Sequence, residues 1–292
     1  MGGNTSQIGK KREQRYSHGL SLLRECIEQR RGPLAASGDR ALLKAEKISL
    51  SFGKLQALTR VDVDVREGEV LAIIGPNGAG KTSLLNVISG FYLAQGGEVF
   101  FHEKRITGFR SSRIAQLGLC RTFQNIALYT GLTVIDNIIA GRHPYIGYNF
   151  LAGMIYFPWA HREEARQRAI AEDIIDFLEL EHVRGAVVGT LAYGLRKRVE
   201  LGRALALEPR VLLLDEPMAG MNLDEKEDMA RFIIDINEFL KIPVVLVEHD
   251  MGVVMDIADR IVVLDFGYKI AEGTPESIKK DSRVIAAYLG EG

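Results

Sequence analysis

Short apolar runs separated by turns dominate most of the chain and indicate a fold built around strands. Residues 70–74, 211–214 and 244–247 are uninterrupted apolar segments, which is typical of strands that helices cover on both faces. Residues 42–52 and 57–65 alternate apolar and polar positions, as strands with one solvated face do. The other strands that we expect are residues 98–101, 261–264 and 268–270.

The pattern changes to helical periodicity between about residues 126 and 200. Within residues 165–180, Ile170, Ile174 and Leu178 recur at intervals of four, so they lie on one side of a helix. We therefore expect an α/β core that is interrupted by a mostly helical subdomain over about 126–200. No internal repeat is visible, which indicates one such core per chain.

The composition is that of an ordinary globular protein. Of 292 residues, 47% are hydrophobic and 26% are charged, and the formal net charge is −1, so bulk charge gives no reason to expect a nucleic-acid partner. Cys26 and Cys120 lie far apart without the spacing of metal ligands, and we expect incidental or buried thiols in a reducing compartment. No apolar run reaches the ~18 residues that a membrane helix needs, and the polar N-terminus shows no secretory signal pattern.

The first 40 residues differ from the rest because they carry an excess of positive charge. They contain eight Lys or Arg residues and four acidic residues, a local net charge of +4. Leu20, Leu23 and Ile27 share one helix face, so one interpretation is an amphipathic helix at about 18–31 that contacts a membrane surface or a partner. The interpretation that we favour is a solvated, partly disordered extension, followed by the folded domain at 41–292.

Residues 75–82 carry the clearest functional signal. The run Gly-Pro-Asn-Gly-Ala-Gly-Lys-Thr matches G-x-x-x-x-G-K-[ST], the phosphate-binding loop (P-loop), between an expected strand and an apolar helix. Glycines let backbone N–H groups surround phosphate oxygens, and the helix N-terminus adds partial positive charge. We expect Lys81 to reach the β- and γ-phosphates and the Thr82 hydroxyl to bind Mg²⁺. The predicted nucleotide-binding residues of this loop are Gly75, Asn77, Gly78, Gly80, Lys81, Thr82 and Ser83.

Polar residues follow two of the buried runs, at the point where each strand ends. Asp215 and Glu216 come directly after residues 211–214, which places them beside the P-loop in a parallel sheet. Because neighbouring strand residues point to opposite sides, we expect Asp215 to support Mg²⁺ through water and Glu216 to orient and deprotonate the attacking water. His249 follows the run at 244–247 and could donate to the γ-phosphate, although a lone histidine is more often structural.

From about residue 42 to the C-terminus, the order of these motifs resembles that of the ATP-binding-cassette (ABC) ATPases. The P-loop, Gln124, residues 191–194 (Leu-Ala-Tyr-Gly), the acidic pair and His249 follow one another as in that family. The resemblance implies a P-loop NTPase core with an antiparallel β subdomain and a helical subdomain, and hydrolysis of ATP with Mg²⁺. It also implies that each ATP lies between the P-loop of one cassette and the signature motif of a second cassette, identical or different.

The resemblance suggests roles for residues outside the P-loop. Phe52 matches the aromatic residue that stacks on adenine, although a strand aromatic in the core is an open alternative. Gln124 matches the glutamine that contacts Mg²⁺ and the attacking water. Ala192, Tyr193 and Gly194 match the signature motif and are expected to face the ATP that the partner cassette binds.

Three positions depart from the general family pattern. Ala192 stands in place of the usual serine, Leu195 in place of glutamine, and Asn222 in place of aspartate. The missing serine hydroxyl removes one hydrogen bond to the γ-phosphate, worth about 1.5–3 kcal/mol when the acceptor is charged. We therefore expect weakened function at the ATP that Ala192 faces, which the P-loop of the partner binds.

Two of these departures, Ala192 and Asn222, narrow the resemblance to one subgroup. Together with residues 248–251 and the ending at 284–291, they resemble the larger ATPase of branched-chain amino acid importers. Such importers combine two ATPases, two transmembrane permease subunits and a periplasmic substrate-binding protein, and related ones carry urea, short amides or aromatic acids. The resemblance implies a peripheral subunit at the cytoplasmic face of the inner membrane. The aromatic stretch at 145–159 either lines the permease docking groove or packs locally.

Two other functions stay open. The first is a soluble ABC ATPase in a non-transport process, but such proteins usually carry two cassettes or long coiled-coil insertions, and this chain has neither. The second is a regulatory cassette that binds ATP without hydrolysing it, which the presence of both Glu216 and His249 disfavours.

Overall fold

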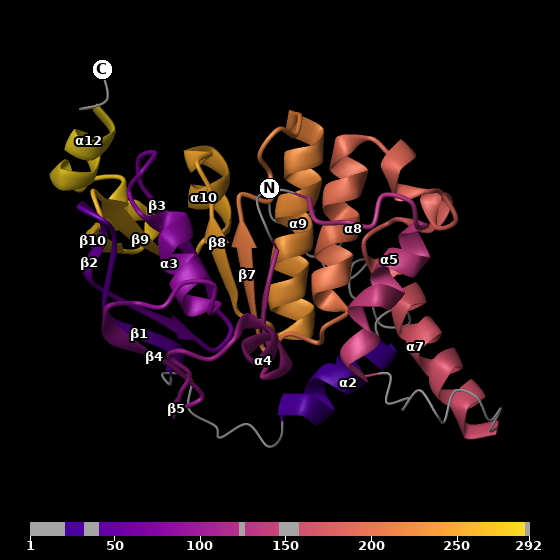
Figure 1. Ribbon diagram of the computed structural model, residues 1–292. Helices are drawn as coiled ribbons and strands as arrows, with labels where there is room; N and C mark the ends of the chain where they lie inside the picture. The colour runs from indigo at the N-terminus through magenta and orange to yellow at the C-terminus, as the bar shows by residue number, and fades with distance from the viewer. Residues whose placement is uncertain (1–20, 32–40, 123–125, 146–157, 290–292) are drawn as a thin grey trace. The chain divides into compact units, whose positions relative to one another are not determined.

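The computed structural model describes residues 21–31, 41–122, 126–145 and 158–289 (Figure 1). These residues form two compact units. The helical unit contains α2 (Ser21–Arg31) and the described residues of Ile126–Glu208. The sheet unit contains the described residues of Ala35–Asn125 and Pro209–Gly292. None of the helices in these ranges is both long and apolar enough to span a membrane.

Two sheets form the sheet unit, which confirms the expected combination of an antiparallel sheet with a mainly parallel one. The antiparallel sheet has the order β2-β1-β4-β5. The second sheet has the order β10-β9-β3-β8-β7-β6, and all its neighbours are parallel except β10 and β9. The strands are β1 (Ala41–Phe52), β2 (Leu55–Arg66), β3 (Val70–Ile74), β4 (Gly96–Phe101), β5 (Lys104–Arg105), β6 (Leu119–Arg121), β7 (Val211–Asp215), β8 (Val244–Val247), β9 (Arg260–Asp265) and β10 (Tyr268–Gly273).

Alternate residues of the parallel sheet pack into two separate cores. Leu71 and Ile73 of β3 join the core that the antiparallel sheet and α3 share, whereas Ala72 and Ile74 join a core with α10, α11 and α12. Both faces of β3 are therefore covered, as its uninterrupted apolar run predicted. The helices of this unit are α3 (Lys81–Ile88), α4 (Ser111–Gln116), α9 (Leu223–Leu240), α10 (Met251–Ile257), α11 (Pro275–Ile278) and α12 (Ser282–Leu289).

Three longer helices form most of the helical unit. They are α5 (Val134–Gly141), α7 (Pro158–Phe177) and α8 (Tyr193–Leu205), and short 3-10 turns occupy His143–Tyr145, Glu181–Val183 and Val188–Thr190. Ile170, Ile174 and Leu178 are fully buried, which confirms the predicted apolar side of this helix. A Cβ at Gly202 of α8 would lie 3.0–3.3 Å from side chains of Ile138, Ile174 and Leu178, so α8 packs closely on α5 and α7.

The N-terminal helix α2 packs on α7 through its apolar face (Figure 1). Leu23 and Ile27 are buried, and Asp173 of α7 accepts the backbone N–H of Leu22 at 3.1 Å. A carboxylate at this position satisfies a helix N–H that has no intrahelical partner, and it interacts favourably with the helix dipole. Residues 21–31 are thus folded, within the range 18–31 where the pattern allowed an amphipathic helix. The preceding basic residues lie outside the described chain.

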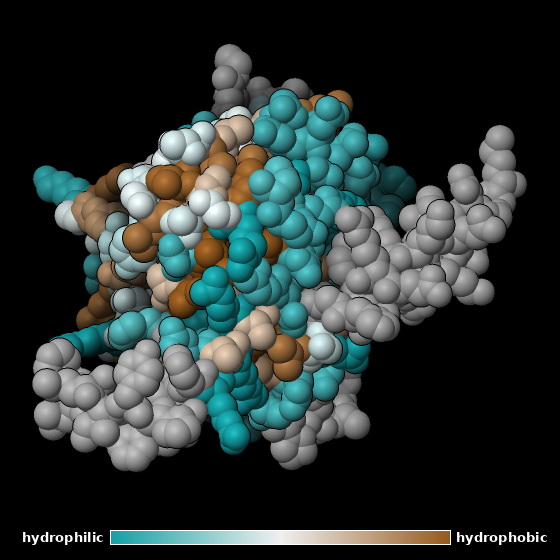
Figure 2. All heavy atoms as spheres, turned by 90° about the vertical axis from the view of Figure 1, so that its right-hand side faces the viewer, coloured by the Kyte–Doolittle hydropathy of each residue, from teal (hydrophilic) through white to brown (hydrophobic). Residues whose placement is uncertain are grey.

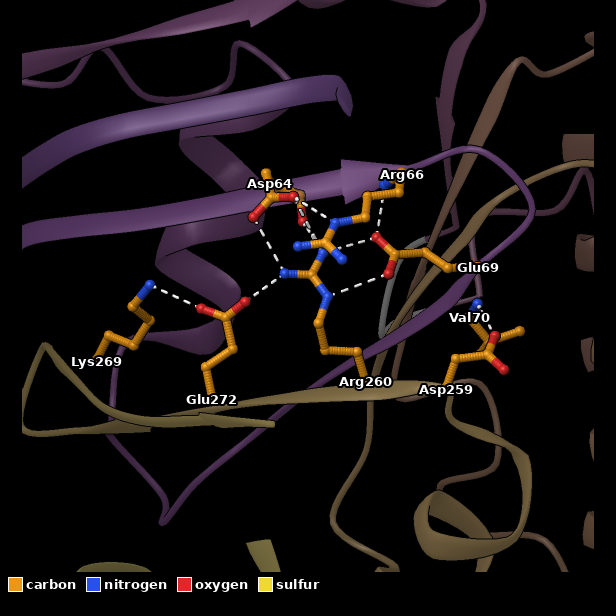
Figure 3. A network of polar contacts seen from close by, with 8 residues as sticks. All are labelled: Asp64, Arg66, Glu69, Val70, Asp259, Arg260, Lys269 and Glu272. Atoms are coloured by element: carbon orange, nitrogen blue, oxygen red, sulfur yellow. Dashed lines mark hydrogen bonds and ion pairs between the residues drawn. The ribbon is translucent and has the colours of Figure 1, made fainter. Parts of the chain in front are cut away.

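Arg260 joins the two sheets of the sheet unit (Figure 3). Its guanidinium donates to Asp64 of β2 at 3.1 Å, to Glu69 of the β2–β3 turn at 2.7 Å, and to Glu272 of β10. The Arg260 side chain is only 11% exposed, so it depends on these acceptors for its hydrogen bonds. Lys269 adds a second cation to Glu272 at 2.9 Å.

The charge of Arg260 sets the protonation of its partners. Burial alone raises the pKa of the Asp64 carboxyl, but the hydrogen bonds and charges of Arg260 and Arg66 outweigh burial, and the pKa falls below its usual value. The pKa of Glu272 is also lowered, because Lys269 and Arg260 together outweigh its burial. Ionised carboxylates in the folded state therefore stabilise the fold at neutral pH, and this contribution is lost as the pH falls.

We expect Arg260→Met to lower the free energy of unfolding at pH 7 by about 3 kcal/mol, because three carboxylates lose their shared cation. Ordinary values for Glu and Asp are 4.5 and 3.8, so the wild type should lose the contribution of these groups below about pH 4.5, as the pH falls through their lowered pKa values. The variant should show a shallower decline over this range. Chemical denaturation between pH 7 and pH 3 measures both effects.

Arg105→Met is the matched control for this prediction, because Arg105 forms an exposed pair with Glu98 in the same unit. Exposed pairs contribute little to stability, so the control should follow the wild type at every pH. An Arg260→Met curve that runs parallel to the wild-type curve down to pH 3 would show that the network does not control acid stability.

Candidate functional site

Three parallel strands bring the predicted site residues to one edge of the sheet. Ile73 of β3 pairs with Val247 of β8, and Val247 pairs with Asp215 of β7, so the three strands end at the same level. The P-loop follows β3, Glu216 follows β7, and His249 follows β8. The structure therefore brings these segments together, as the carboxyl ends of parallel strands require.

Close packing around the P-loop explains two of its glycines. Gly75 has φ 146°, and a Cβ there would lie 2.0 Å from the carbonyl oxygen of Leu264. Gly80 has φ 101°, and its Cβ would lie 2.6 Å from the carbonyl oxygen of Ala57. The β9–β10 turn also supports the loop, because the N–H of Gly267 donates to the carbonyl of Ala79 at 3.1 Å. Only residues without a side chain fit these positions.

The P-loop opens directly into α3, and the start of this helix can bind an anion. Gly80 is the N-cap of α3, and no side chain caps the start of this helix. The Lys81 side chain is nearly buried, and its ammonium donates to the carbonyls of Gly75 at 2.6 Å and Pro76 at 2.8 Å. A cation inside the loop and the N-terminus of a helix together form a site for phosphate.

Asp215 is almost completely buried, and its two carboxylate oxygens differ. Oδ2 accepts a hydrogen bond from Arg121 Nη2 at 2.8 Å. Oδ1 is also buried, and no described residue donates a hydrogen bond to it. A buried carboxylate oxygen without a donor is suited to a metal ion or to water bound to the metal.

The donor set fits Mg²⁺ that arrives with a nucleotide. The described residues contain no group of three His, Cys, Asp or Glu side chains that could hold a metal alone. Mg²⁺ usually binds through one or two protein oxygens together with phosphates and water. Asp215 Oδ1 and the Thr82 hydroxyl, at the start of α3, are protein oxygens of this kind.

Glu216 and His249 form a direct pair at the sheet edge. Glu216 Oε1 lies 2.5 Å from His249 Nε2, and the backbone N–H of Glu216 donates to Val247 at 2.9 Å. Glu216 has φ 49°, a left-handed conformation that is uncommon outside glycine and that occurs at functional sites. The two side chains that the sequence predicted for water activation and γ-phosphate contact therefore touch.

Glu248 is a site residue to which the sequence assigned no role. Its Oε1 accepts the N–H of Met218 at 2.8 Å and its Oε2 accepts the N–H of His249 at 3.2 Å, so it links the loops after β7 and β8. Burial raises the pKa of Glu248, and the nearby Glu216 raises it further, while the two backbone hydrogen bonds oppose this. Its place beside His249 at the end of a buried run was the only sequence signal for this role.

The departure at Asn222 has a structural explanation. Asn222 caps α9, because its side chain accepts the N–H of Glu225 at 2.9 Å while Glu225 accepts the N–H of Asn222 at 3.1 Å. Asparagine and aspartate cap helices about equally well. The substitution therefore leaves the start of α9 intact.

Phe52 lies at the end of β1 and is 46% exposed, in edge-to-face contact with Tyr92 at 5.3 Å between ring centroids. This exposure is inconsistent with a core aromatic and leaves a ring face for a ligand.

Tyr145 of the helical unit donates from its hydroxyl to the carbonyl of Leu207 at 2.6 Å, which is local packing. Gln124 and residues 146–157 lie outside the described residues.

The signature residues occupy the start of α8 in the helical unit. Ala192 is the N-cap, is exposed, and provides no side-chain cap, while Gly194 is buried. Arg196 and Lys197 lie within about 6 Å of the Tyr193 ring. The first N–H groups of α8 therefore keep the anion-binding character of an uncapped helix start.

The fold and the site define a P-loop ATPase, and the comparisons with known proteins identify its family. The family described as "ABC transporter" matches residues 58–219, and the family described as "Branched-chain amino acid ATP-binding cassette transporter" matches residues 269–292. The chain belongs to the ABC transporter family, in which it is an ATP-binding, ATP-hydrolysing subunit.

Similar proteins cover nearly the whole domain. The chain is 39% identical to the high-affinity branched-chain amino acid transport ATP-binding protein BraF of Pseudomonas aeruginosa, over 86% of this chain and 99% of BraF. It is 34% identical to the corresponding protein LivG of Escherichia coli, over 86% of this chain and 98% of LivG. A solved ADP conformation of an ABC transporter cassette is 33% identical with a TM-score of 0.74, over 86% of this chain and 99% of that one.

We expect Glu216→Gln to abolish most steady-state ATP hydrolysis while ATP still binds, because the amide cannot accept the proton of the attacking water. The loss should be at least about a hundredfold. Measurement of phosphate release, together with the amount of ATP retained on the protein, tests this. Lys81→Ala is the contrast, because removal of the cation inside the P-loop should weaken ATP binding itself. Normal turnover in Glu216→Gln would exclude Glu216 as the base.

Proposed function

We propose that this chain hydrolyses ATP for an importer of branched-chain amino acids or of a related small polar solute such as urea, an amide or an aromatic acid. The observation that carries this proposal is the convergence of the P-loop, Asp215, Glu216 and His249 at one sheet edge. The relatives that match nearly their full length are branched-chain amino acid transport ATP-binding proteins, which supports this choice of substrate.

The side chains at the sheet edge divide the chemistry among them. The amides of the P-loop and the start of α3 hold the β- and γ-phosphates, and Lys81 neutralises them. Thr82, Asp215 and Gln124 would hold Mg²⁺, which would supply Lewis-acid stabilisation of charge on the phosphates. Glu216 accepts the proton of the attacking water, and His249 orients Glu216 and donates to the γ-phosphate. Phe52 stacks on the adenine ring.

The site requires a second cassette, identical to this one or different. The uncapped start of α8 at Ala192, Tyr193 and Gly194 suits a γ-phosphate that the P-loop of the partner holds. Leu195 and the missing hydroxyl at Ala192 make this half of the partner's site weaker than a serine-containing signature. One similar solved cassette, 25% identical with a TM-score of 0.67 over 80% of this chain and 98% of that one, is a dimer in a post-hydrolysis state with ADP and phosphate.

Two transmembrane permease subunits and a periplasmic binding protein complete the proposed importer, with this chain at the cytoplasmic face of the inner membrane. Exposed apolar residues are available for docking on each unit: Phe91, Tyr92 and Leu93 after α3, and Tyr129 and Leu132 before α5. Figure 2 shows that hydrophobic side chains gather on part of one face, next to hydrophilic ones. The relatives named above are transport proteins, which favours this function over a non-transport role.

We expect leucine uptake into vesicles to depend on this chain. The test assembles the chain with the ATPase, permease and binding proteins that are encoded beside it, in vesicles that contain ATP. Radiolabelled leucine should enter only when the binding protein is present, and leucine should stimulate ATP hydrolysis. Vesicles with Lys81→Ala in this chain are the matched control, and they should lose most uptake because one P-loop cannot hold ATP.

Uptake of urea, an amide or an aromatic acid in place of leucine would keep the importer assignment and correct the substrate. A chain that hydrolyses ATP but neither binds these permeases nor supports uptake of any solute would contradict the proposed function.

A further inference from the structure

Arg121 lies at the end of β6 and its side chain is buried between two parts of the candidate site. Nη2 donates to Asp215 Oδ2 at 2.8 Å, and Nη1 donates to Asn86 Oδ1 at 2.8 Å and to Ser89 Oγ at 2.9 Å. The Arg121 and Asp215 side chains are 4% and 1% exposed. Two acceptors of the guanidinium therefore lie at the end of α3, and the third is the carboxylate at the end of β7.

This arrangement leaves one oxygen of Asp215 for a ligand. Oδ2 is occupied by Arg121, whereas Oδ1 is buried without a donor among the described residues. A buried charged oxygen without a donor is destabilising unless a ligand satisfies it. Arg121 thus occupies one oxygen of the carboxylate and leaves the other, Oδ1, for a ligand.

The same guanidinium connects the elements that carry the other site residues. Asn86 and Ser89 lie in the last turn and the C-cap of α3, and α3 begins with Lys81 and Thr82 of the P-loop. Thr122, the next residue along the chain, donates its N–H to Leu213 of β7 at 2.9 Å, so the end of β6 is held against the strand that leads to Asp215. Gln124, which the sequence predicts to contact Mg²⁺, follows Thr122 by two positions in the sequence.

We propose that Arg121 is a positioning residue of the metal site, which holds Asp215 so that Oδ1 accepts a hydrogen bond from a water molecule on Mg²⁺. The proposal rests on the proposed role of Asp215 in binding Mg²⁺. Arg121 does not touch the nucleotide; it acts through Asp215. Groups that orient a metal-binding side chain commonly change metal affinity 10–100-fold when they are removed.

An arginine is required because the site uses the fork of the guanidinium. Two different nitrogens reach acceptors on two different elements, and the planar group fixes the angle between them. A lysine keeps the charge beside Asp215 but has only one nitrogen, so it cannot reproduce the fork that joins the Asp215 carboxylate to α3. The lysine variant therefore separates charge from orientation.

The test measures how much Mg²⁺ strengthens the binding of a non-hydrolysable ATP analogue to the full chain. Calorimetry gives the affinity for the analogue with Mg²⁺ and with a chelator, in the wild type, Arg121→Met and Arg121→Lys. We expect the strengthening by Mg²⁺ to fall about tenfold or more in Arg121→Met and by less in Arg121→Lys. The affinity in chelator should stay within about twofold of the wild type, because the P-loop alone sets it.

Arg105→Met is the control, because it removes an exposed arginine from a pair with Glu98 in the same unit. It should leave both affinities unchanged. An Arg121→Met protein with normal strengthening by Mg²⁺, even if it melts at a lower temperature, would show that Arg121 only stabilises the fold and would overturn the proposal. Equal weakening with and without Mg²⁺ would overturn it as well.

A second variant keeps the test decisive if Arg121→Met does not fold. Asn86→Ala combined with Ser89→Ala removes the two acceptors that orient the guanidinium but keeps the pair with Asp215. It should reduce the strengthening by Mg²⁺ in the same direction, by a smaller factor. An unchanged value in this variant would overturn the proposal. A wild-type chain that gains nothing from Mg²⁺ would instead refute the metal role of Asp215 itself.

Discussion

The parallel pairing of β3, β7 and β8 is the constraint on which the candidate site depends. This pairing sets Ile73, Val247 and Asp215 level with one another, so the three segments that follow them meet without any further adjustment of the chain. A shift of one residue in the pairing of β7 with β8 would turn Asp215 to the opposite face of the sheet. The two cores on either side of the sheet hold the register of β3, because Leu71 and Ile73 face one core and Ala72 and Ile74 face the other.

The buried charged residues at the sheet edge are a second constraint on the site. Asp215, Glu248 and Arg121 leave water on folding, which is unfavourable unless each charge finds a partner. Arg121 and backbone N–H groups provide most of these partners, and one oxygen of Asp215 has no donor among the residues that the structure describes. The folded chain thus holds an incomplete polar site, which a nucleotide with Mg²⁺ is suited to complete.

The sequence predicted best those features of the fold that a single strand, loop or helix determines. The uninterrupted apolar runs before Gly75, Asp215 and His249 have the length of strands and are too short for typical helices. The P-loop motif fits a strand followed by a helix, so the architecture around it could be predicted. Alternation predicted two strands at 42–52 and 57–65, and the family resemblance predicted their antiparallel sheet. Ile170, Ile174 and Leu178 were predicted to share one side of a helix, because a spacing of four positions defines a helix face, and all three are buried.

Interactions between elements distant along the chain could not be predicted in this way. Arg121 meets Asp215 across 94 residues, and Glu248 meets Met218 across 30, so no local pattern indicates either contact. The packing of the N-terminal helix could not be predicted for the same reason, because Asp173, which accepts the N–H of Leu22, lies 151 residues away along the chain. Such contacts depend on the packing of whole elements, which periodicity does not describe.

The most direct test of this account is a structure of the chain paired with its second cassette, a non-hydrolysable ATP analogue and Mg²⁺. The account predicts β- and γ-phosphate oxygens about 3 Å from backbone nitrogens of residues 78–82. It also predicts a metal-bound water beside Asp215 Oδ1 and the α8 N-terminus of the second cassette over the γ-phosphate. A nucleotide that lies away from this loop, or a loop that stays empty at saturating concentration, would contradict it.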